Sequence, residues 1–396
     1  MARRLIFVAL PMFIACLFIT VLYDITGINQ AAAAPDLSSG LWIGGQTAVA
    51  SSTWFSETVD TTGGYVNHKS TTLALDSNEL PHIAYFNTDL NLLQYASFSS
   101  TNWVTETVPI GIVPGYDVAL AIDSNDYPHI AYHDDTLNDM NYIHWNGTMW
   151  LSETVESGLG FSSFHAIVLD SSDNPHLSYI GSGNSLKYAY WNGASWAIET
   201  VDDSGNVASE ISLVLDSNEN PHIGYRFDDT PFLQHAYWDG AQWVLEVAGP
   251  PANVGVWLSM DLDSLDSPHF AYLDFIFGDL EYVYWNGSGW ITDTVESDNS
   301  VGAYPSIVLD SNDYPHISYL DSTNFNLKYA SWNGTAWTIT TADDSGDVGV
   351  YTSLGLDSQN NPHISYYDDG NGALKYATVV MSQNDSRFVY LPTITQ

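Results

Sequence analysis

The seven-fold repetition of one motif constrains the fold of this chain more than any other feature. The motif is Asp-Ser-x-x-x-Pro-His, as in LALDSNELPHIAY near the N-terminus and LGLDSQNNPHISY near the C-terminus. Successive copies lie 46 or 47 residues apart, and their histidines are His82, His129, His176, His222, His269, His316 and His363. A fixed period indicates one structural unit per copy, each packed on its neighbours. The 396 residues are therefore predicted to form one large repeat domain.

The same motif excludes the hydrolytic site that its residue types suggest. Asp310, Ser311 and His316 are the residue types of a catalytic triad. A triad holds one nucleophile, one base and one acid beside a single oxyanion site, so seven equal copies cannot all act on one substrate. We therefore interpret the motif as a turn followed by a strand that builds the fold.

Each unit predicts four short strands. The sixth unit shows them in order as SIVLD, PHISY, LKYASW and WTITT, all rich in β-branched and aromatic residues and bounded by turn residues. Asn-Gly or Asp-Gly separates the third and fourth strands in five units, at 146–147, 192–193, 239–240, 286–287 and 333–334. These dipeptides accept positive φ at low cost, as a tight hairpin requires.

Seven units of four antiparallel strands form the sequence pattern of an all-β fold, the seven-bladed β-propeller. The chain from about Trp54 to Val380 resembles the propellers of secreted, sialidase-like bacterial proteins with BNR repeats. This resemblance implies a fold and says little about activity. We expect the seven motif histidines to supply hydrogen bonds between blades and not to bind metal.

The two ends of the array predict how the ring closes. Six units end in a tryptophan-led fourth strand, and the last unit, after LKYATVV, lacks one. The missing copy stands at the start of the array as WFSETV, residues 54–59. We therefore predict that this N-terminal segment pairs as the outer strand of the last blade, which removes an open sheet edge.

Three segments are assigned outside the propeller, which spans 54–380. Residues 1–33 begin MARR, continue with an apolar run and end near an Ala-x-Ala site, which predicts a secretory signal peptide and an extracellular protein. An uncleaved membrane anchor is the alternative, because the run is close to spanning length. Residues 34–53 form an N-terminal extension and 381–396 a C-terminal tail, for which surface attachment is an option. The only cysteine, Cys16, would leave with the signal, so no disulfide framework is expected.

The charge of the chain excludes one class of partner. After removal of the signal, 6 basic and 46 acidic residues remain, a net charge of about −40. Such a surface repels the phosphates of nucleic acids and anionic polymers, and it favours a soluble monomer. No cofactor is expected, with Ca²⁺ as the one ion that this acidic surface suggests.

Residues that break the repeat are the better candidates for function, because one asymmetric ligand cannot use seven equal copies. Arg226 is the only arginine of the repeat array, and it follows the second-strand tyrosine directly, as His133 does two units earlier. With the adjacent Asp134 and Asp228, they define a candidate ligand site across blades two to four. Drift among solvated loop residues explains the same pattern without a ligand.

A second set of candidates stands six residues before the motif aspartate. Phe164, Trp257, Tyr304 and Tyr351 hold this position in four units, and we expect them to ring the mouth of the central channel. His165 follows Phe164 and lies outside the motif. Aromatic faces beside carboxylates suit a neutral sugar, whereas core packing explains the aromatics alone.

We conclude from the sequence that this is a secreted propeller that binds a neutral glycan or a cell-surface protein without catalysis. A glycoside hydrolase that uses two loop aspartates, among Asp134, Asp228, Asp274, Asp321 and Asp368, is the alternative. A structural or adhesion scaffold is the third. Sialidase activity is disfavoured, because recognition of a carboxylated sugar by that class uses three arginines and this array has one.

Overall fold

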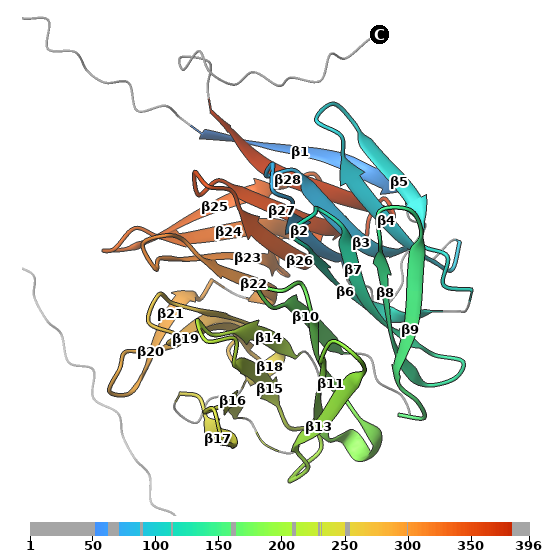
Figure 1. Cartoon of the computed structure of the whole chain (residues 1–396). Coiled ribbons are helices and arrows are strands. Elements are labelled where there is room, and N and C mark those ends of the chain that lie inside the picture. The colour runs from blue at the N-terminus through green and yellow to red at the C-terminus, as the bar shows by residue number, and fades with distance from the viewer. Residues whose placement is uncertain are drawn as a thin grey trace, which may run out of the picture. The chain divides into compact units, whose positions relative to one another are not determined.

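The structure is a computed structural model that describes residues 52–61, 71–87, 90–111, 114–159, 164–207, 211–228, 230, 232–249, 254–298 and 300–381. These residues lie in one compact unit. Within it the strands form seven four-stranded antiparallel sheets, and Figure 1 shows them as successive blades. The chain is a seven-bladed β-propeller, as the repeat predicts.

Each blade is built from consecutive strands in the order of the sequence. The strands of blades 1 to 3 are β2 (Thr71–Leu75), β3 (Pro81–Asn87), β4 (Leu92–Phe98) and β5 (Trp103–Thr107); β6 (Pro114–Ile122), β7 (Pro128–Asp134), β8 (Asp139–Trp145) and β9 (Trp150–Glu156); β10 (His165–Leu169), β11 (Pro175–Ile180), β12 (Leu186–Trp191) and β13 (Trp196–Asp202). A short 3-10 turn, η1 (Ser182–Asn184), links β11 and β12.

Blades 4 to 6 repeat the same order. Their strands are β14 (Ser212–Leu215), β15 (Pro221–Arg226), β16 (Leu233–Trp238) and β17 (Trp243–Val247); β18 (Val254–Leu262), β19 (Pro268–Asp274), β20 (Asp279–Trp285) and β21 (Trp290–Glu296); β22 (Val301–Leu309), β23 (Pro315–Asp321), β24 (Asn326–Trp332) and β25 (Trp337–Asp343). The first strand of each blade contacts the first strands of its two neighbours, so the first strands form the innermost ring.

Blade 7 joins the two ends of the described chain. It consists of β26 (Val348–Leu356), β27 (Pro362–Asp368), β28 (Ala373–Met381) and, as its outer strand, β1 (Ser52–Thr61). β1 runs antiparallel to β28 from Ser52 opposite Met381 to Thr61 opposite Ala373 (Figure 1). The prediction that the N-terminal segment closes the ring is confirmed, with the strand beginning two residues before Trp54.

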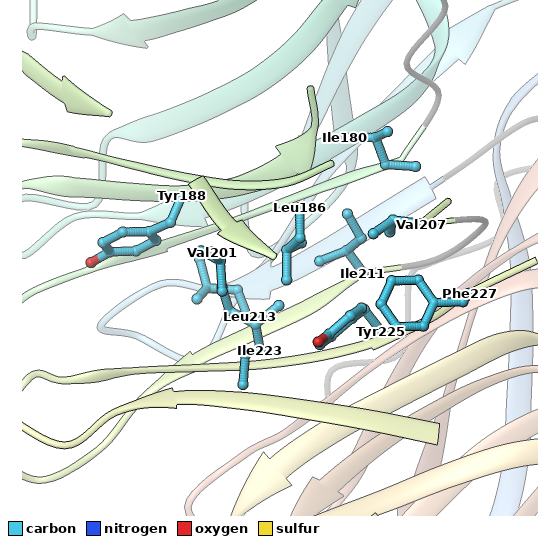
Figure 2. Close-up of a cluster of buried hydrophobic side chains, with 11 residues drawn as sticks. Ile180, Leu186, Tyr188, Val201, Val207, Ile211, Leu213, Ile223, Tyr225 and Phe227 are labelled. Atoms are coloured by element: carbon cyan, nitrogen blue, oxygen red, sulfur yellow. The ribbon is translucent and has the colours of Figure 1, made fainter. Parts of the chain in front are cut away.

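The hydrophobic core lies between blades and not within any one of them. The cluster in Figure 2 joins Ile180, Leu186 and Val201 of blade 3 to Leu213 and Ile223 of blade 4. Six further clusters repeat this arrangement around the described ring. Because a blade has two apolar faces and covers neither by itself, it depends on both neighbours for burial.

The motif histidines correct one expectation, because they bond inside their own blade. Nδ1 of His129 lies 2.6 Å from the hydroxyl of Tyr142 on the third strand, and Nε2 lies 3.5 Å from Asp123 of the preceding turn. Five other blades hold the same histidine–tyrosine pair, and in blade 4 a second histidine, His235, replaces the tyrosine. The predicted inter-blade role is therefore wrong. These imidazoles fix the motif turn to the third strand.

A different part of the motif connects the blades. The serine after the motif aspartate donates its backbone N–H and its hydroxyl to a carboxylate of the next motif turn, as Ser77 does to Asp126 at 2.7 and 2.8 Å. Ser124, Ser217 and Ser264 make the same two bonds to Asp173, Asp266 and Asp313. The backbone of Ser358 bonds Glu79 across the closure of the ring. We call these contacts the inter-blade latches.

The hairpin turns between the third and fourth strands are longer than a two-residue loop. In blade 2 Trp145 pairs with Trp150, which leaves four residues in the loop. Gly147 takes the positive φ of 89°, while Asn146 accepts hydrogen bonds from the backbone of Thr148 and Met149 through its side chain. The asparagine thus serves as an Asx cap and the glycine alone needs the left-handed conformation.

Several predictions fall on residues outside those described, namely the signal peptide at 1–33, nearly all of the extension at 34–53 and the tail after Met381. Among the residues that the structure describes, no helix is both long and apolar enough to cross a membrane.

Candidate functional site

A cavity of ≈ 260 Å³ lies at the end of the central channel where the first strands begin. All seven blades contribute to its wall, through residues such as Thr71 of blade 1, Asp117 of blade 2 and Ile211 of blade 4. We call it the channel cavity. Its wall comes from equivalent positions of the seven blades, in or directly before their first strands.

Aromatic side chains occupy one side of the channel cavity. Trp257 on β18, Tyr304 on β22 and Tyr351 on β26 line this side, whereas Phe164, directly before β10 of blade 3, lines the cavity apart from them. The ring centroids of Trp257 and Tyr304 are 4.2 Å apart, and those of Tyr304 and Tyr351 are also 4.2 Å apart. Each of the four side chains is partly exposed. Three neighbouring blades thus present a continuous arc of rings to the channel, which we call the aromatic arc.

Two members of the aromatic arc sit in an unusual backbone conformation. Tyr304 has φ of 52° and Tyr351 φ of 54°, and the register of each strand with its partner shifts at these residues. A left-handed conformation is costly for a bulky residue and is kept where the surrounding structure enforces it. The bulge turns each ring out of the strand's normal alternation.

The glycine two residues before each tyrosine explains how the bulge fits. A Cβ on Gly302 would lie 2.7 Å from Cα of Leu280 in the neighbouring blade, and one on Gly349 would lie 2.9 Å from Cα of Leu327. Both glycines also have positive φ. Only glycine allows this close approach of two backbones. The sequence Val-Gly-x-Tyr therefore builds the platform of the arc.

The side of the channel cavity formed by blades 2 and 3 contains one polar pair, Asp117 and His165, among apolar residues. His165 is buried, and its Nε2 lies 3.0 Å from the carbonyl oxygen of Ala131, so Nε2 carries the proton. Asp117 accepts the backbone N–H of His165 at 3.2 Å, and its Oδ2 lies 3.7 Å from Nδ1. Burial lowers the pKa of His165, and the Asp117 carboxylate opposes this shift. The side chain of His165 is 0% exposed and that of Asp117 is 20% exposed, so the carboxylate is the acceptor of the pair that reaches the cavity.

Serine hydroxyls of the cavity wall connect the first strands to one another. The Oγ of Ser353 accepts the backbone N–H of Leu73 at 2.9 Å, across the junction of blades 7 and 1. Ser212, Ser259 and Ser306 accept N–H groups of Met260, Ile307 and Leu354 in the same manner. These hydroxyls hold the ring together and leave the aromatic arc and Asp117 as the distinctive surface of the cavity.

His133 and Asp134 lie at the end of β7 and do not line the channel cavity. The side chain of His133 is 1% exposed, with Nδ1 2.9 Å from Asp135 Oδ1. Asp134 is also 1% exposed and accepts the backbone N–H of Thr136 at 2.7 Å. Both side chains are thus held inside the fold. Their role in ligand binding stays a prediction.

Arg226 and Asp228 also lie away from the lining of the channel cavity. The guanidinium of Arg226 is largely buried, donates to the carbonyl of Phe227 at 3.0 Å and lies 3.7 Å from Asp228. Asp228 is exposed. Among the nine candidates, the structure brings five together around the channel cavity: Phe164, His165, Trp257, Tyr304 and Tyr351. The other four, His133, Asp134, Arg226 and Asp228, do not line it.

Four of the five carboxylates suggested for a hydrolase, all except the exposed Asp228, hold turns in place. Asp274 accepts the backbone N–H groups of Ile276 and Phe277, and Asp321 and Asp368 cap the equivalent turns of blades 6 and 7. In the described lining of the channel cavity, Asp117 is the one carboxylate. The described residues also include no group of three or more His, Cys, Asp or Glu side chains arranged to hold a metal ion.

Asp117 is the cavity residue that the sequence reasoning missed, although a signal was present. It stands six residues before the motif aspartate Asp123, the same offset as the four aromatics. Glu210 has the same offset before Asp216 and lies outside the described residues.

Comparisons with known proteins support the fold and identify no relative by sequence. No family model and no curated protein sequence matches the chain. Among solved structures, polysaccharide lyase Uly1 is similar with a TM-score of 0.53 at 11% identity, over 81% of this chain and 91% of the lyase. The fucose-specific lectin from Aleuria aurantia has a TM-score of 0.51 at 12% identity, over 70% of this chain and 96% of the lectin.

A third similar structure is the SapL1 lectin in complex with α-methyl fucoside, with a TM-score of 0.51 at 13% identity, over 69% of this chain and 95% of the lectin. At such identities the likeness shows the propeller fold alone.

Proposed function

We propose that this propeller binds a glycan without catalysis, and that a neutral sugar residue sits in the channel cavity. The observation that carries the proposal is the aromatic arc, in which Trp257, Tyr304 and Tyr351 line a concave and mainly apolar site at 4.2 Å ring spacing. The C–H face of a pyranose is apolar and packs on such rings, while its hydroxyl groups donate to acceptors. Asp117 supplies an acceptor across the cavity.

The charge and size of the site narrow the ligand. A chain of net charge −39 disfavours sialylated and uronate polymers. A volume of ≈ 260 Å³ lies just under the range of drug-sized sites, so it accepts one or two sugar units and favours the end of a glycan over its interior. That two of the similar structures are lectins is consistent with this proposal and does not carry it.

A glycan array probed with the purified chain tests the proposal, followed by calorimetry of each neutral hit. We expect binding to neutral glycans that Trp257→Ala weakens, and no release of reducing sugar. Turnover abolished by Asp117→Asn would replace the proposal by the hydrolase. Binding of cells but of no glycan would favour the protein-partner or scaffold alternatives.

We further propose that the protein is secreted and acts as a monomer without a cofactor. The support is the N-terminal apolar run of the sequence and the strong negative charge. N-terminal sequencing of protein from culture medium tests cleavage near Ala33, and sedimentation tests the monomer. Glycan binding measured with and without EDTA tests a contribution of Ca²⁺.

A further inference from the structure

A second hollow, of ≈ 570 Å³, lies between blades 5 and 6. It is formed by the motif turn around Ser267, the hairpin turn at Asn286 and Gly287, and the neighbouring turn of blade 6 with Tyr314. These turns lie at the ends of the strands opposite to the channel cavity, because motif turns and hairpin turns share one face of an antiparallel blade. We call it the blade 5–6 pocket.

The residue before the motif proline differs among the blades, and a tyrosine there covers the hairpin turn of its own blade. The residue before the motif proline is Tyr127 in blade 2 and Tyr314 in blade 6. A Cβ on Gly147 would lie 2.7 Å from the Tyr127 hydroxyl, and one on Gly334 the same distance from the Tyr314 hydroxyl. Each tyrosine thus covers the hairpin turn of its own blade.

Blades 3, 4 and 5 have Asn174, Asn220 and Ser267 before the motif proline, and nothing lies within 4 Å of a Cβ built on the hairpin glycine of any of them. In blade 5 the small side chain of Ser267 therefore leaves the hairpin turn at Gly287 uncovered. The space that a tyrosine ring fills in blades 2 and 6 belongs to the pocket in blade 5.

The walls of the pocket are rigid aromatic rings. Trp285 and Trp332 line it, each held edge-on by the tryptophan across its hairpin, with centroids 5.6 and 5.5 Å apart respectively. Trp337, the partner of Trp332, also lines it and donates its indole N–H to Asp293 Oδ2 at 2.8 Å. Rings fixed in this way lose little entropy when a ligand packs on them.

The polar groups of the pocket are mainly acceptors. Asp263, Asp293 and Asp313 line it, and each carboxylate has lone pairs beyond the hydrogen bonds it makes. His269 also lines the pocket and is 95% buried, with Nδ1 against the Tyr282 hydroxyl and Nε2 3.5 Å from Asp263. A ligand that fits these walls has an apolar face for the indoles and several hydroxyl donors for the carboxylates.

We infer that the blade 5–6 pocket is a second glycan subsite, which takes one neutral pyranose unit stacked on Trp285 or Trp332. The inference rests on the proposed function for its ligand class and adds a second location. Because the two sites lie on opposite faces of the described ring, one molecule would join two glycan chains. The pocket volume lies within the usual range of small-molecule sites.

The test fills the pocket with the residue that blades 2 and 6 already carry. Ser267→Tyr places a ring over Gly287 as in those blades, and Asn220→Tyr introduces the same residue at the equivalent position of blade 4 as a matched control. Calorimetry of the full chain uses methyl α-D-mannopyranoside, methyl β-D-glucopyranoside and methyl α-L-fucopyranoside. Thermal melting checks that all variants are folded.

We expect two sites in the original protein, one site in Ser267→Tyr with at least tenfold weaker binding at the lost one, and two sites in Asn220→Tyr. Trp257→Ala should remove the other site. Unchanged stoichiometry and affinity in Ser267→Tyr overturn this inference, and if Trp257→Ala still loses binding, the proposed function stands. If the original protein binds none of the glycosides and no array glycan, both proposals fail.

Discussion

The ring of motif turns and the ring of channel residues contain seven equivalent positions each, and they differ in what occupies them. In the motif ring the backbone N–H of the motif serine donates to a carboxylate of the next turn at six of the seven described positions, from Ser77 to Asp126 in blade 1 round to Ser358 and Glu79 at the closure. In the channel ring the equivalent offset carries Asp117, Phe164, Trp257, Tyr304 and Tyr351. Uniform positions maintain the architecture, and the varied positions are where one asymmetric ligand can be recognised.

Removal of β1 should destabilise the propeller more than any single substitution. β1 supplies the outer strand of blade 7, including Trp54, which packs edge-on against Tyr329 at 5.3 Å, and Asp60, which accepts from Tyr85. Deletion of residues 1–61 should lower the melting temperature by about 10 °C or more, since several kcal/mol are lost. Deletion of 1–51 is the control and should melt normally. Equal melting of both would refute closure by this strand.

Lowering the pH should reduce the stability of the folded propeller before most carboxylates become protonated. Burial lowers the pKa of eight described histidines, to about 4 for His129 and His222. The unfolded chain takes up these protons near pH 6.5 and the folded chain only at lower pH, so stability falls as pH drops from 6.5 to 4. Asp261, whose burial raises its pKa to about 6, opposes this only in part.

Blade 4 offers a way to sharpen the acid prediction. His235 contributes to the lowered pKa of His222, and burial is the larger cause. His235→Tyr restores the pair found in the other six blades, so melting measured across pH 7 to 4 should show a smaller loss than in the original protein. An unchanged pH dependence would assign the acid sensitivity to other groups.

Trp257→Ala should weaken ligand binding in the channel cavity, with less effect on folding stability than the loss of β1. Loss of one ring of the aromatic arc should weaken binding of a neutral glycan about tenfold or more, equivalent to ~1.4 kcal/mol. Trp257→Tyr, which matches Tyr304 and Tyr351, is the control and should keep most of the affinity. Calorimetry measures both. Equal affinities for all three proteins would place the ligand outside the arc.

Loss of a single inter-blade latch should destabilise the propeller far less than loss of β1. Asp126→Ala removes two hydrogen bonds from Ser77 and places alanine at φ of 64°, which should cost about 1–2 kcal/mol of unfolding free energy. Asp126→Asn should cost less, because asparagine tolerates this conformation and occupies the equivalent position at Asn360. Chemical denaturation measures both. A smaller loss for alanine than for asparagine would contradict the role assigned to the latch.

The sequence by itself determined the number of blades, the four strands of each, the N-terminal outer strand and the four channel aromatics. The number of blades and the outer strand follow from the fixed period across the copies, and the strands of each blade follow from the alternation of residue types within one copy. Asp117 stands at the same offset of six residues before its motif aspartate, so its place in the channel was also predictable. Equivalent positions of a repeat lie at the same distance from the axis of the ring.

Only the tertiary structure decided which side chains meet across blades. It placed the motif histidines against tyrosines of their own blade, gave the inter-blade bonds to Ser77 and its equivalents, and drew His133 and Asp134 into the interior. It also opened the blade 5–6 pocket above Gly287. The reason is physical: a period fixes what each unit contains, whereas contacts between units depend on the spacing and angle at which whole blades pack.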